Sequence, residues 1–529
     1  MADGHFQLHG IDLAVIGIYL AVMVGIGLGL SGKSHSAKDY FLAGRSMTWP
    51  VIGFSLFASN ISSTTLVGLA GDAYATGISV FNYEWMAVFI LVFYAVFILP
   101  QVLRSQVFTM PEYLQKRFDG RIRTYFAALT LFLNIVVDTA ATLYAGGLIL
   151  QLIFPAIPMW QMIAALALVA GLYTVLGGLS AVMITDVIQA VLLIIGSVTI
   201  TAFAFFKVGG WAAISQQVDA AHLSLIRPVG DAGVPWLGLI TGVPLLGFYF
   251  WCTNQFMVQR ILSAKSIDQG RWGALFAGFL KLPVLFIMVL PGTMAILLYP
   301  DLPRADLVYP TLMFDLLPVG MLGLVIAGFL AALMSQIDST LNSASTLVTM
   351  DFIRRWRPNL TSAQLMQYGR ITTVIFMIVA VAWAPQIANF KSLFKYLQTI
   401  LSYAVPPVVV MFLLGTFWAR ANAHGAFLSL VVGVAAGVVF FLANEVFGLT
   451  HIHFLYVAPI LSVLCAVVLV IGSLTSAPPP PEKVTPFVWT RRAYDAETAA
   501  LKTRKWYANY RILSLLLMAL TAALVFAFR

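Results

Sequence analysis

Long apolar stretches recur along almost the whole chain, and this pattern constrains the fold more than any other feature of the sequence. Roughly 20 apolar residues of helix cross a hydrocarbon core about 30 Å thick. By that measure the 529-residue chain contains about fourteen spans. They begin near Ile11, Met47, Ile78, Arg123, Met159, Asp186, Trp236, Trp272, Val319, Arg370, Leu393, Gly425, His453 and Ile512. Because lipid leaves backbone groups of open sheet edges unsatisfied, we predict an all-α integral membrane protein.

The scarcity of charge excludes the soluble alternatives. Only 10% of the residues are charged and 60% are hydrophobic, whereas about a quarter of a soluble chain is charged. So few charges cannot cover a soluble fold of this size, which excludes a cytosolic enzyme, a disordered protein and a nucleic-acid binder. Cys252 and Cys465 lie in apolar stretches and are expected to pack as small hydrophobes.

Lys and Arg residues gather in alternate loops and predict the orientation. These residues are Lys33, Lys38, Arg45, Arg104, Lys116, Arg117, Arg121, Arg260, Lys265, Arg271, Arg354, Arg355, Arg357, Arg420, Lys483, Arg491, Arg492, Lys502, Arg504 and Lys505. The positive-inside rule makes these loops cytoplasmic and places both termini on the extracellular or periplasmic side. We therefore expect a multi-pass protein of the plasma membrane, and the compact loops favour a bacterial inner membrane.

Two spans are interrupted by helix-breaking residues. The second contains the polar run Ser59–Thr65, and the seventh contains Gly242, Pro244 and Gly247. Freed carbonyls are tolerated in hydrocarbon where they line a cavity or bind something. Two broken helices five spans apart predict an inverted-repeat transporter with its site where the breaks meet. The alternative is a pair of kinks satisfied by hydroxyls and neighbouring helices.

A few polar residues at membrane depth indicate a substrate site. Glu84 lies in the third span, Lys281 in the eighth and Gln398 early in the eleventh. Together they offer an acceptor, a donor and an amide that does both, which suits a neutral polyhydroxylated ligand. Phe250 and Trp251 could supply apolar faces for its C–H surfaces. The alternative for Glu84 and Lys281 is a structural ion pair between helices.

Hydroxyl groups on the ninth span indicate a cation site. Ala332, Ser335, Gln336 and Ser339 share one helix face. Hydroxyl and freed carbonyl oxygens suit a hard monovalent cation, although small-residue helix packing produces the same pattern. Asp186, taken alone, could be an acidic residue favoured at a helix N-terminus.

Motifs of catalysis and of nucleotide binding are absent from the sequence. It contains no nucleophile elbow, P-loop, HExxH or CxxC. We therefore predict a transporter driven by an ion gradient and not an enzyme. A transporter-like membrane sensor is the non-transport alternative, but the only long cytoplasmic segment, 474–510, is too short for an output domain.

Several blocks resemble the sodium:solute symporter family. Asp39–Met47 followed by Ser55–Ser62 is similar to its opening signature. Later blocks match at Met110–Leu114 with Lys116–Phe118, Gly177–Val182 with Thr185–Asp186, Gln259–Arg260 with Ala264–Lys265, and Leu341–Thr346 with Thr349–Asp351. The resemblance runs from about 39 to 418 and is strongest to the sodium/glucose (sodium/galactose) cotransporter branch. It implies a LeuT-like core of two inverted sets of five helices.

On this basis the chain divides into five parts. Residues 1–46 hold the N-terminal tail, the first helix and a cytoplasmic loop. Residues 47–418 form the ten-helix inverted-repeat core, and 419–473 add two peripheral helices. Residues 474–510 form a cytoplasmic Pro-rich loop, and 511–529 form the last helix.

The resemblance also assigns the sugar site. The matching positions are Asn60, Thr65, Glu84, Trp251, Lys281 and Gln398, with Phe250 as the inner gate. Three positions depart from the family pattern: Thr65 replaces His or Gln, Phe250 replaces tyrosine, and Gly247 replaces Asn or Thr. Since such polar contacts discriminate hydroxyl groups, the departures leave the identity of the sugar open.

For sodium, the resemblance implies the positions Ala58, Ile61, Ala332, Ser335 and Gln336. Gln336 stands where the family has a second serine. Some members bind a second ion, and the matching positions here are Asp186, Asp338 and Ser339 together with Ser335. We infer a second sodium ion or a proton there, because two nearby carboxylates raise the pKa of one of them.

We therefore predict a secondary active symporter working by alternating access. It couples sodium to a glucose- or galactose-like hexose or a cyclic polyol, without nucleic acid or an obligatory protein partner. Proton coupling, and a sugar acid or other carboxylate as substrate, are the alternatives within transport.

Overall fold

Helices account for all the regular structure in the part of the chain described by the computed structural model, residues 8–31, 36–231, 233–389 and 393–529. The helices are α1 (Gly10–Ser31), α2 (Ala37–Leu42), α3 (Trp49–Asn60), α4 (Ser63–Thr76), α5 (Asn82–Phe93), α6 (Leu99–Arg104), α7 (Met110–Arg117), α8 (Gly120–Phe132), α9 (Ala140–Ile153), α10 (Met159–Val208), α11 (Gly210–Gln217), α12 (Trp236–Phe248), α13 (Gln255–Leu262), α14 (Ile267–Lys281), α15 (Leu290–Leu298), α16 (Val308–Leu316), α17 (Met321–Leu347), α18 (Arg354–Trp356), α19 (Ser362–Trp383), α20 (Leu393–Ala404), α21 (Pro406–Phe417), α22 (Ala423–Phe441), α23 (Phe454–Leu474), α24 (Arg491–Leu501) and α25 (Tyr510–Ala527).

The number of membrane spans is close to the predicted one. Ten helices among the described residues are long and apolar enough to cross a membrane, and the number rises to thirteen when each of three bent pairs counts as one span. A shorter apolar helix, Met159–Gly171, precedes a kink in α10. Gly178 adopts φ +61° at this kink, a conformation that favours glycine.

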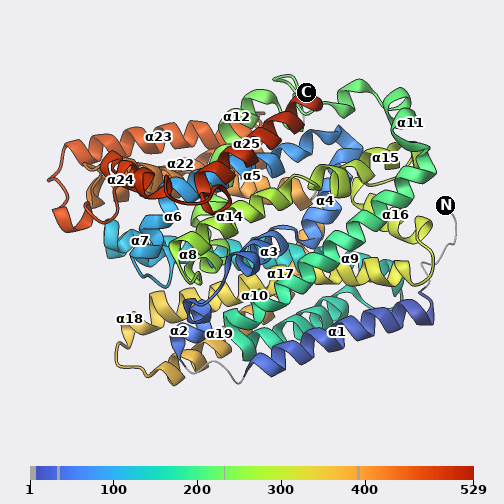
Figure 1. Ribbon diagram of the computed structural model, residues 1–529, viewed down its shortest axis with the longest axis horizontal. Helices are drawn as coiled ribbons and strands as arrows, with labels where there is room; N and C mark the ends of the chain where they lie inside the picture. Colours follow the sequence, from blue (N-terminus) through green and yellow to red (C-terminus); the bar gives the residue numbers. More distant parts are fainter. Residues whose placement is uncertain (1–7, 32–35, 232, 390–392) are drawn as a thin grey trace.

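The long helices run side by side, and the largely buried α17 packs along α10, which also faces outward (Figure 1). Small residues allow this close approach. A β-carbon on Gly328 would lie 3.0 Å from the carbonyl oxygen of Leu192, and one on Gly196 would lie 3.5 Å from the Cα of Val325. Such small-residue contacts are the usual basis of helix packing in membranes.

The second span breaks where the sequence predicts. Helices α3 and α4 meet at 59° around Ile61 and Ser62. Two further bends were not predicted, 44° between α14 and α15 and 54° between α20 and α21. Pro283 lies in the first of these bends and Pro406 begins the helix after the second. Proline removes a backbone donor, which explains both positions.

The predicted break at Gly242–Gly247 in the seventh span is wrong in position. Helix α12 continues through Pro244 and a π-helical segment, Tyr249–Thr253, and the chain leaves helical geometry at Asn254 (ψ 128°). The glycines serve packing instead. A β-carbon on Gly242 would lie 2.1 Å from the carbonyl oxygen of Leu455 on α23, so only glycine allows this approach.

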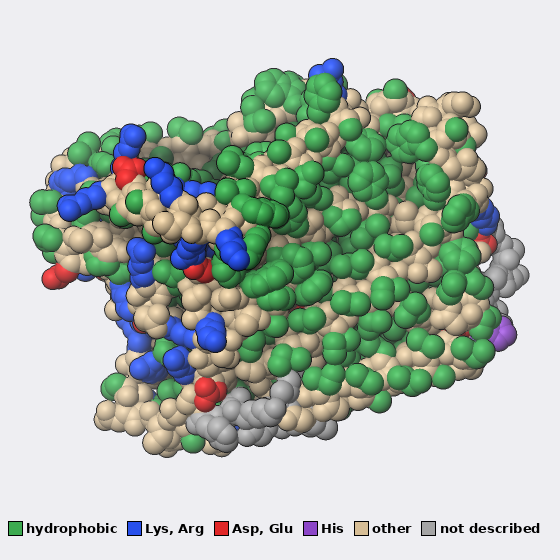
Figure 2. Space-filling model, viewed as in Figure 1, with side chains coloured by type: hydrophobic (Ala, Val, Ile, Leu, Met, Phe, Trp, Pro, Cys, Tyr) green, Lys and Arg blue, Asp and Glu red, His purple; other side chains and the backbone are tan. Residues whose placement is uncertain are grey.

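Exposed Lys and Arg side chains gather at the end of the molecule that holds α2, α18 and α24 (Figure 2). Hydrophobic side chains cover most of the rest of this face, as expected for a lipid-facing surface. Several arginines assigned to loops from the sequence are in fact buried. Arg117 donates to the backbone carbonyls of Gly415, Trp418 and Ala421, and Arg260 is fully enclosed.

The two ends of the described chain contact loops that the sequence assigns to the outer face. The carboxylate of Asp12 accepts from the backbone N–H groups of Gly320 and Gly323, both at 2.7 Å. The carbonyl of Phe528 accepts from the N–H of Leu225 at 2.7 Å. Both ends therefore lie on the side away from the basic loops.

The segment 474–510, predicted as a surface loop, contains α24 and is tied to the helix bundle. The N–H of Trp489 donates to the carbonyl of Thr416 at 2.8 Å. Arg271 at the start of α14 pairs with Glu497, and Arg504 pairs with Asp268 at 2.8 Å. These contacts fix the segment against the basic end of the bundle.

Candidate functional site

A cavity lies where the break between α3 and α4 meets α5, α12, α17 and α20. It holds about 860 Å³ of space between protein atoms, part of it open to solvent. Of the residues assigned to the sugar site and its gate, the following line it: Asn60, Thr65, Glu84, Phe250, Trp251 and Gln398. The structure therefore brings these side chains to one place from five separate helices or helix ends.

Lys281 joins this group through its contacts. Its ammonium donates to the carboxylate of Glu84 and to the side-chain oxygen of Asn60. Its Nζ also lies 5.6 Å from the ring centre of Phe57 and 5.4 Å from that of Trp251. The Lys281 side chain is fully buried and that of Glu84 is 6% exposed. A buried pair with additional hydrogen bonds of this kind compensates the cost of desolvating two charges.

Two helix breaks position the group. Helix α3 ends at Asn60 and α14 ends at Lys281, each at a bend between two helix segments. A side chain at a helix end projects into the space that the bend opens. The ion pair therefore connects two broken spans to Glu84 on α5.

The remaining cavity side chains supply hydroxyl, amide and aromatic surfaces. The hydroxyl of Thr65 donates to the Asn60 carbonyl at 3.1 Å. Gln398, near the start of the described side chains of α20, lines the cavity. The rings of Phe250 and Trp251 meet edge to face at 5.3 Å, and Trp251 is 4% exposed. The arrangement can bind a molecule with many hydroxyl groups on one side and C–H surface on the other.

The break in the second span frees backbone carbonyls. The N–H of Ser62 bonds to the carbonyl of Asn60, and the N–H of Thr65 bonds to the hydroxyl of Ser62. Among the described residues, the carbonyls of Ala58 and Ile61 are thus left without their i+4 backbone donors. These are the two carbonyls that the sequence assigned to sodium, and their oxygen chemistry fits a hard cation.

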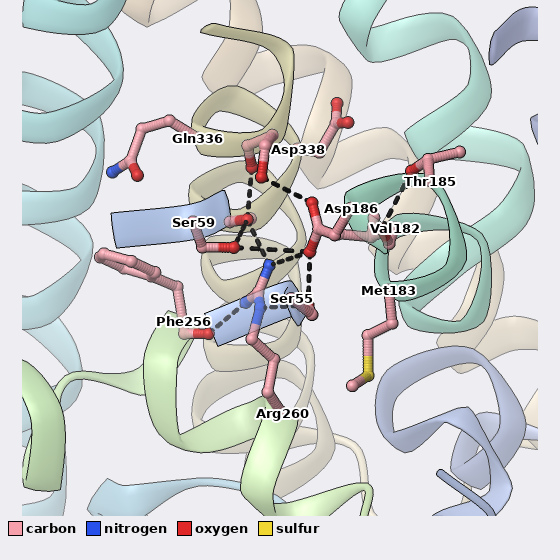
Figure 3. A network of polar contacts seen from close by, with 12 residues as sticks. Ser55, Ser59, Val182, Met183, Thr185, Asp186, Phe256, Arg260, Gln336 and Asp338 are labelled. Atoms are coloured by element: carbon pink, nitrogen blue, oxygen red, sulfur yellow. Dashed lines mark hydrogen bonds and ion pairs between the residues drawn. The ribbon is translucent and has the colours of Figure 1, made fainter. Parts of the chain in front are cut away.

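The structure distributes the predicted α17 ligands differently. Ala332 and Ser335 are buried at the helix centre, and the Ser335 hydroxyl donates to the carboxylate of Asp186 at 2.6 Å. Gln336 instead lines the cavity at the α3–α4 break, and its side chain points away from Asp186 (Figure 3). Since consecutive residues of a helix point about 100° apart, Ser335 faces Asp186 while Gln336 faces the cavity.

Asp186 is the centre of a buried network (Figure 3). Its carboxylate forms an ion pair with Arg260 at 2.9 Å, and both side chains are at most 1% exposed. Ser55 donates to the same carboxylate and accepts from the Arg260 guanidinium at 2.7 Å. Ser59 and Ser339 lie 3.0 Å apart, hydroxyl to hydroxyl, and join α3 to α17. The network thus fastens four spans together around one carboxylate.

This geometry corrects two expectations. Asp186 lies well inside the span Gly177–Val208 and is not an N-terminal helix residue. The resemblance implies a second ion next to the Asp186 carboxylate, but the structure places the Arg260 guanidinium there. Asp338 lies to one side, where its carboxylate accepts from the Thr174 hydroxyl at 2.6 Å.

Sequence reasoning also missed Asp138, which lines the same cavity. The signal was a lone carboxylate near the middle of the apolar span Gly120–Ile153. Within the described ranges, no group of three or more His, Cys, Asp or Glu side chains forms a metal cluster.

A model of the sodium:solute symporter family matches residues 40–433. The chain belongs to the sodium:solute symporter family. This confirms the resemblance seen in the sequence, and the prediction of a symporter and not an enzyme.

Curated relatives match over most of the chain. The sodium/glucose cotransporter 4 of Danio rerio is 35% identical over 94% of this chain and 83% of its own length. The sodium/myo-inositol cotransporter 2 of Oryctolagus cuniculus is 36% identical over 91% and 79%. The chain is thus similar to both kinds of cotransporter to nearly the same degree.

Solved structures agree with the fold. The substrate-bound, outward-open structure of a Na⁺-coupled sialic acid symporter has a TM-score of 0.79 and 25% identity, over 89% of this chain and 99% of that one. A nucleobase-cation-symport-1 family transporter in a closed conformation has a TM-score of 0.57 at 15% identity, which supports the fold alone. The predicted all-helical membrane transporter fold is thereby confirmed.

Proposed function

We propose that the protein is a secondary active symporter that uses the inward sodium gradient to carry a neutral hexose or cyclic polyol across the plasma membrane. The observation that carries the proposal is the Lys281–Glu84 pair with Asn60, set in a cavity at the helix breaks. Its donors, acceptors and aromatic faces match a neutral polyhydroxylated ring. Relatives named for glucose and for myo-inositol support the same substrate class.

The roles of the site residues follow from their positions. The sugar-binding set is Asn60, Thr65, Glu84, Trp251, Lys281, Gln336 and Gln398, and Phe250 is the inner gate. Sodium binds to the carbonyls of Ala58, Ile61 and Ala332 and to the Ser335 hydroxyl. The freed carbonyls of the α3 break support this assignment.

Coupling follows from differential affinity. Sodium between the α3 break and α17 holds these two elements together and favours the outward-open state. Sugar binding then permits closure and release to the inside, since each ligand shifts the population toward the state that binds it better. A second cation at Asp186, Ser339 and Asp338 requires the Arg260 guanidinium to withdraw first.

The proposal includes the arrangement of the whole chain. Residues 47–418 form the transport core as two inverted sets of five helices, preceded by residues 1–46 and followed by 419–473, 474–510 and 511–529. The basic end of the molecule faces the cytoplasm and both termini face outward, as the positive-inside rule requires. The molecule then has fourteen spans, with Met159–Gly171 as the fifth.

Uptake into proteoliposomes tests this function. A panel of labelled hexoses, inositols and sugar acids is offered under an imposed sodium gradient and, separately, a proton gradient. We expect accumulation of a neutral hexose or an inositol with sodium alone. Accumulation driven by protons alone would contradict sodium coupling, and accumulation of sugar acids alone would contradict the substrate class.

A further inference from the structure

Asp138 is a second carboxylate in the substrate cavity, distinct from Glu84. It lies near the middle of the span Gly120–Ile153 and is partly exposed to the cavity. No ion pair or hydrogen bond joins its side chain to another described residue. Two other buried carboxylates differ, since Asp186 pairs with Arg260 and Asp351 pairs with Arg123.

The backbone around Asp138 is held rigidly. Asp138 lies in a π-helical segment, Leu133–Thr139, a helix irregularity that is frequent at functional sites. The Thr139 hydroxyl donates to the carbonyl of Asn134 at 2.6 Å and lies 2.6 Å from the hydroxyl of Thr340 on α17. The Asn134 amide donates to Ser343 at 3.0 Å. These bonds fix the π turn against α17, so the Asp138 carboxylate has a defined position in the cavity.

The charges around the cavity do not balance. Glu84 is compensated by Lys281, whereas Asp138 has no cationic partner among the described residues. The described lining residues include two carboxylates and no Lys, Arg or His. A carboxylate at membrane depth is costly unless donors surround it. A substrate that presents hydrogen-bond donors to Asp138 would offset this cost.

We propose that Asp138 is a specificity-determining residue that accepts hydrogen bonds from hydroxyl or ammonium groups of the substrate and excludes substrates that carry a carboxylate. The proposal rests on the proposed sugar or polyol symport and deepens it. A carboxylate has two oxygens and accepts from two neighbouring hydroxyl groups at once. A carboxylate on the substrate would instead bring like charges together in a medium of low dielectric constant.

Three matched ligands test this assignment. The hexose or polyol accumulated most strongly is compared with its amino derivative and its uronic acid, through their KM values for sodium-driven uptake. For the wild-type protein we expect the amino derivative to bind at least as well as the neutral parent. The uronic acid should bind at least about tenfold more weakly, because its carboxylate is repelled by that of Asp138.

The variant Asp138→Asn keeps the shape of the side chain and removes its charge. It should raise the KM of the neutral parent about fivefold, through loss of charge assistance, and that of the amino derivative by more. It should also reduce the discrimination against the uronic acid about tenfold. Ratios between ligands are measured on one preparation, so they do not depend on the amount of folded protein. Asp301→Asn, at an exposed position, is the matched control and should leave the ratios unchanged.

The other outcomes are equally informative. If Asp138→Asn leaves the three KM ratios unchanged, whether or not total uptake falls, Asp138 has only a structural role and the proposal is wrong. If the wild-type protein accumulates no sugar, the symport proposal fails, and the same ratios are taken from equilibrium binding by calorimetry. Failure of all three ligands to bind would overturn both proposals.

Discussion

Replacement of Lys281 by methionine separates a structural role of the buried ion pair from a role in substrate binding. Methionine keeps most of the side-chain volume and removes the charge. The carboxylate of Glu84, 6% exposed, then loses its cation, and the Asn60 side-chain oxygen loses its donor. Breaking a buried pair by removing one partner costs about 3–5 kcal/mol, since an uncompensated charge stays in the interior. We expect a loss of stability of that size.

The double variant Glu84→Gln/Lys281→Met removes both charges. Replacing a whole buried pair with neutral groups of similar volume is often neutral or stabilising. We therefore expect its thermal unfolding midpoint to return close to that of the wild-type protein. Lys207→Met is the matched control, because Lys207 pairs with Asp315 while both side chains are about half exposed. An exposed pair contributes about 0–1 kcal/mol, so this variant should hardly shift the midpoint.

Sodium-driven uptake decides between the two roles. If the pair binds substrate, the double variant folds normally but has lost two charge-assisted hydrogen bonds of about 1.5–3 kcal/mol each. The kcat/KM of uptake should then fall at least about a hundredfold. A double variant that is as stable as the wild type and transports as well would refute the reasoning. It would show that the pair only ties α5 to α14.

Two further predictions concern helix packing and the segment 474–510. Gly242→Ala should lower the free energy of unfolding by about 1–3 kcal/mol, because its β-carbon would lie 2.1 Å from the Leu455 carbonyl oxygen. Gly25→Ala, with nothing within 4 Å of its β-carbon, should leave the free energy of unfolding unchanged. Equal thermal midpoints for the two variants would contradict the packing account. Burial alone would raise the pKa of Glu497, but its hydrogen bonds and ion pair with Arg271 lower the pKa below the usual value. Because the folded-state pKa is the lower one, this contact is fully present above about pH 4.3 and weakens as the pH falls through the folded-state pKa. Limited proteolysis of 474–510 should increase at acid pH in the wild type and occur already at neutral pH in Glu497→Gln. Identical pH curves for the two proteins would contradict a stabilising role of the Glu497 contact.

The scarcity of charge made much of the site predictable. Glu84 and Lys281 stand out in apolar spans, and the polar run after Ser59 marks a helix break. The same rule applies to Asp138, which was overlooked. Its signal is a lone carboxylate in an apolar span, but the sequence alone does not show whether such a group pairs with a cation on another helix.

Other features could not be predicted because they depend on helix packing. Gly242 and Pro244 look like helix breakers, yet the glycine is required by the approach of α23 and the proline is accommodated within α12. The actual break at Asn254 carries no proline or glycine. Arg260 resembles a cytoplasmic loop residue in sequence, and only the fold brings it to Asp186.

Reverse coupling tests the central claim most directly. Proteoliposomes with equal sodium on both sides receive an inward gradient of the accumulated hexose or polyol, and uptake of radioactive sodium is followed. Since coupling between two ligands is reciprocal, the account predicts that the sugar gradient drives sodium inward, and that the double variant Glu84→Gln/Lys281→Met abolishes this flux. Sugar entry without any accompanying sodium flux would contradict the account.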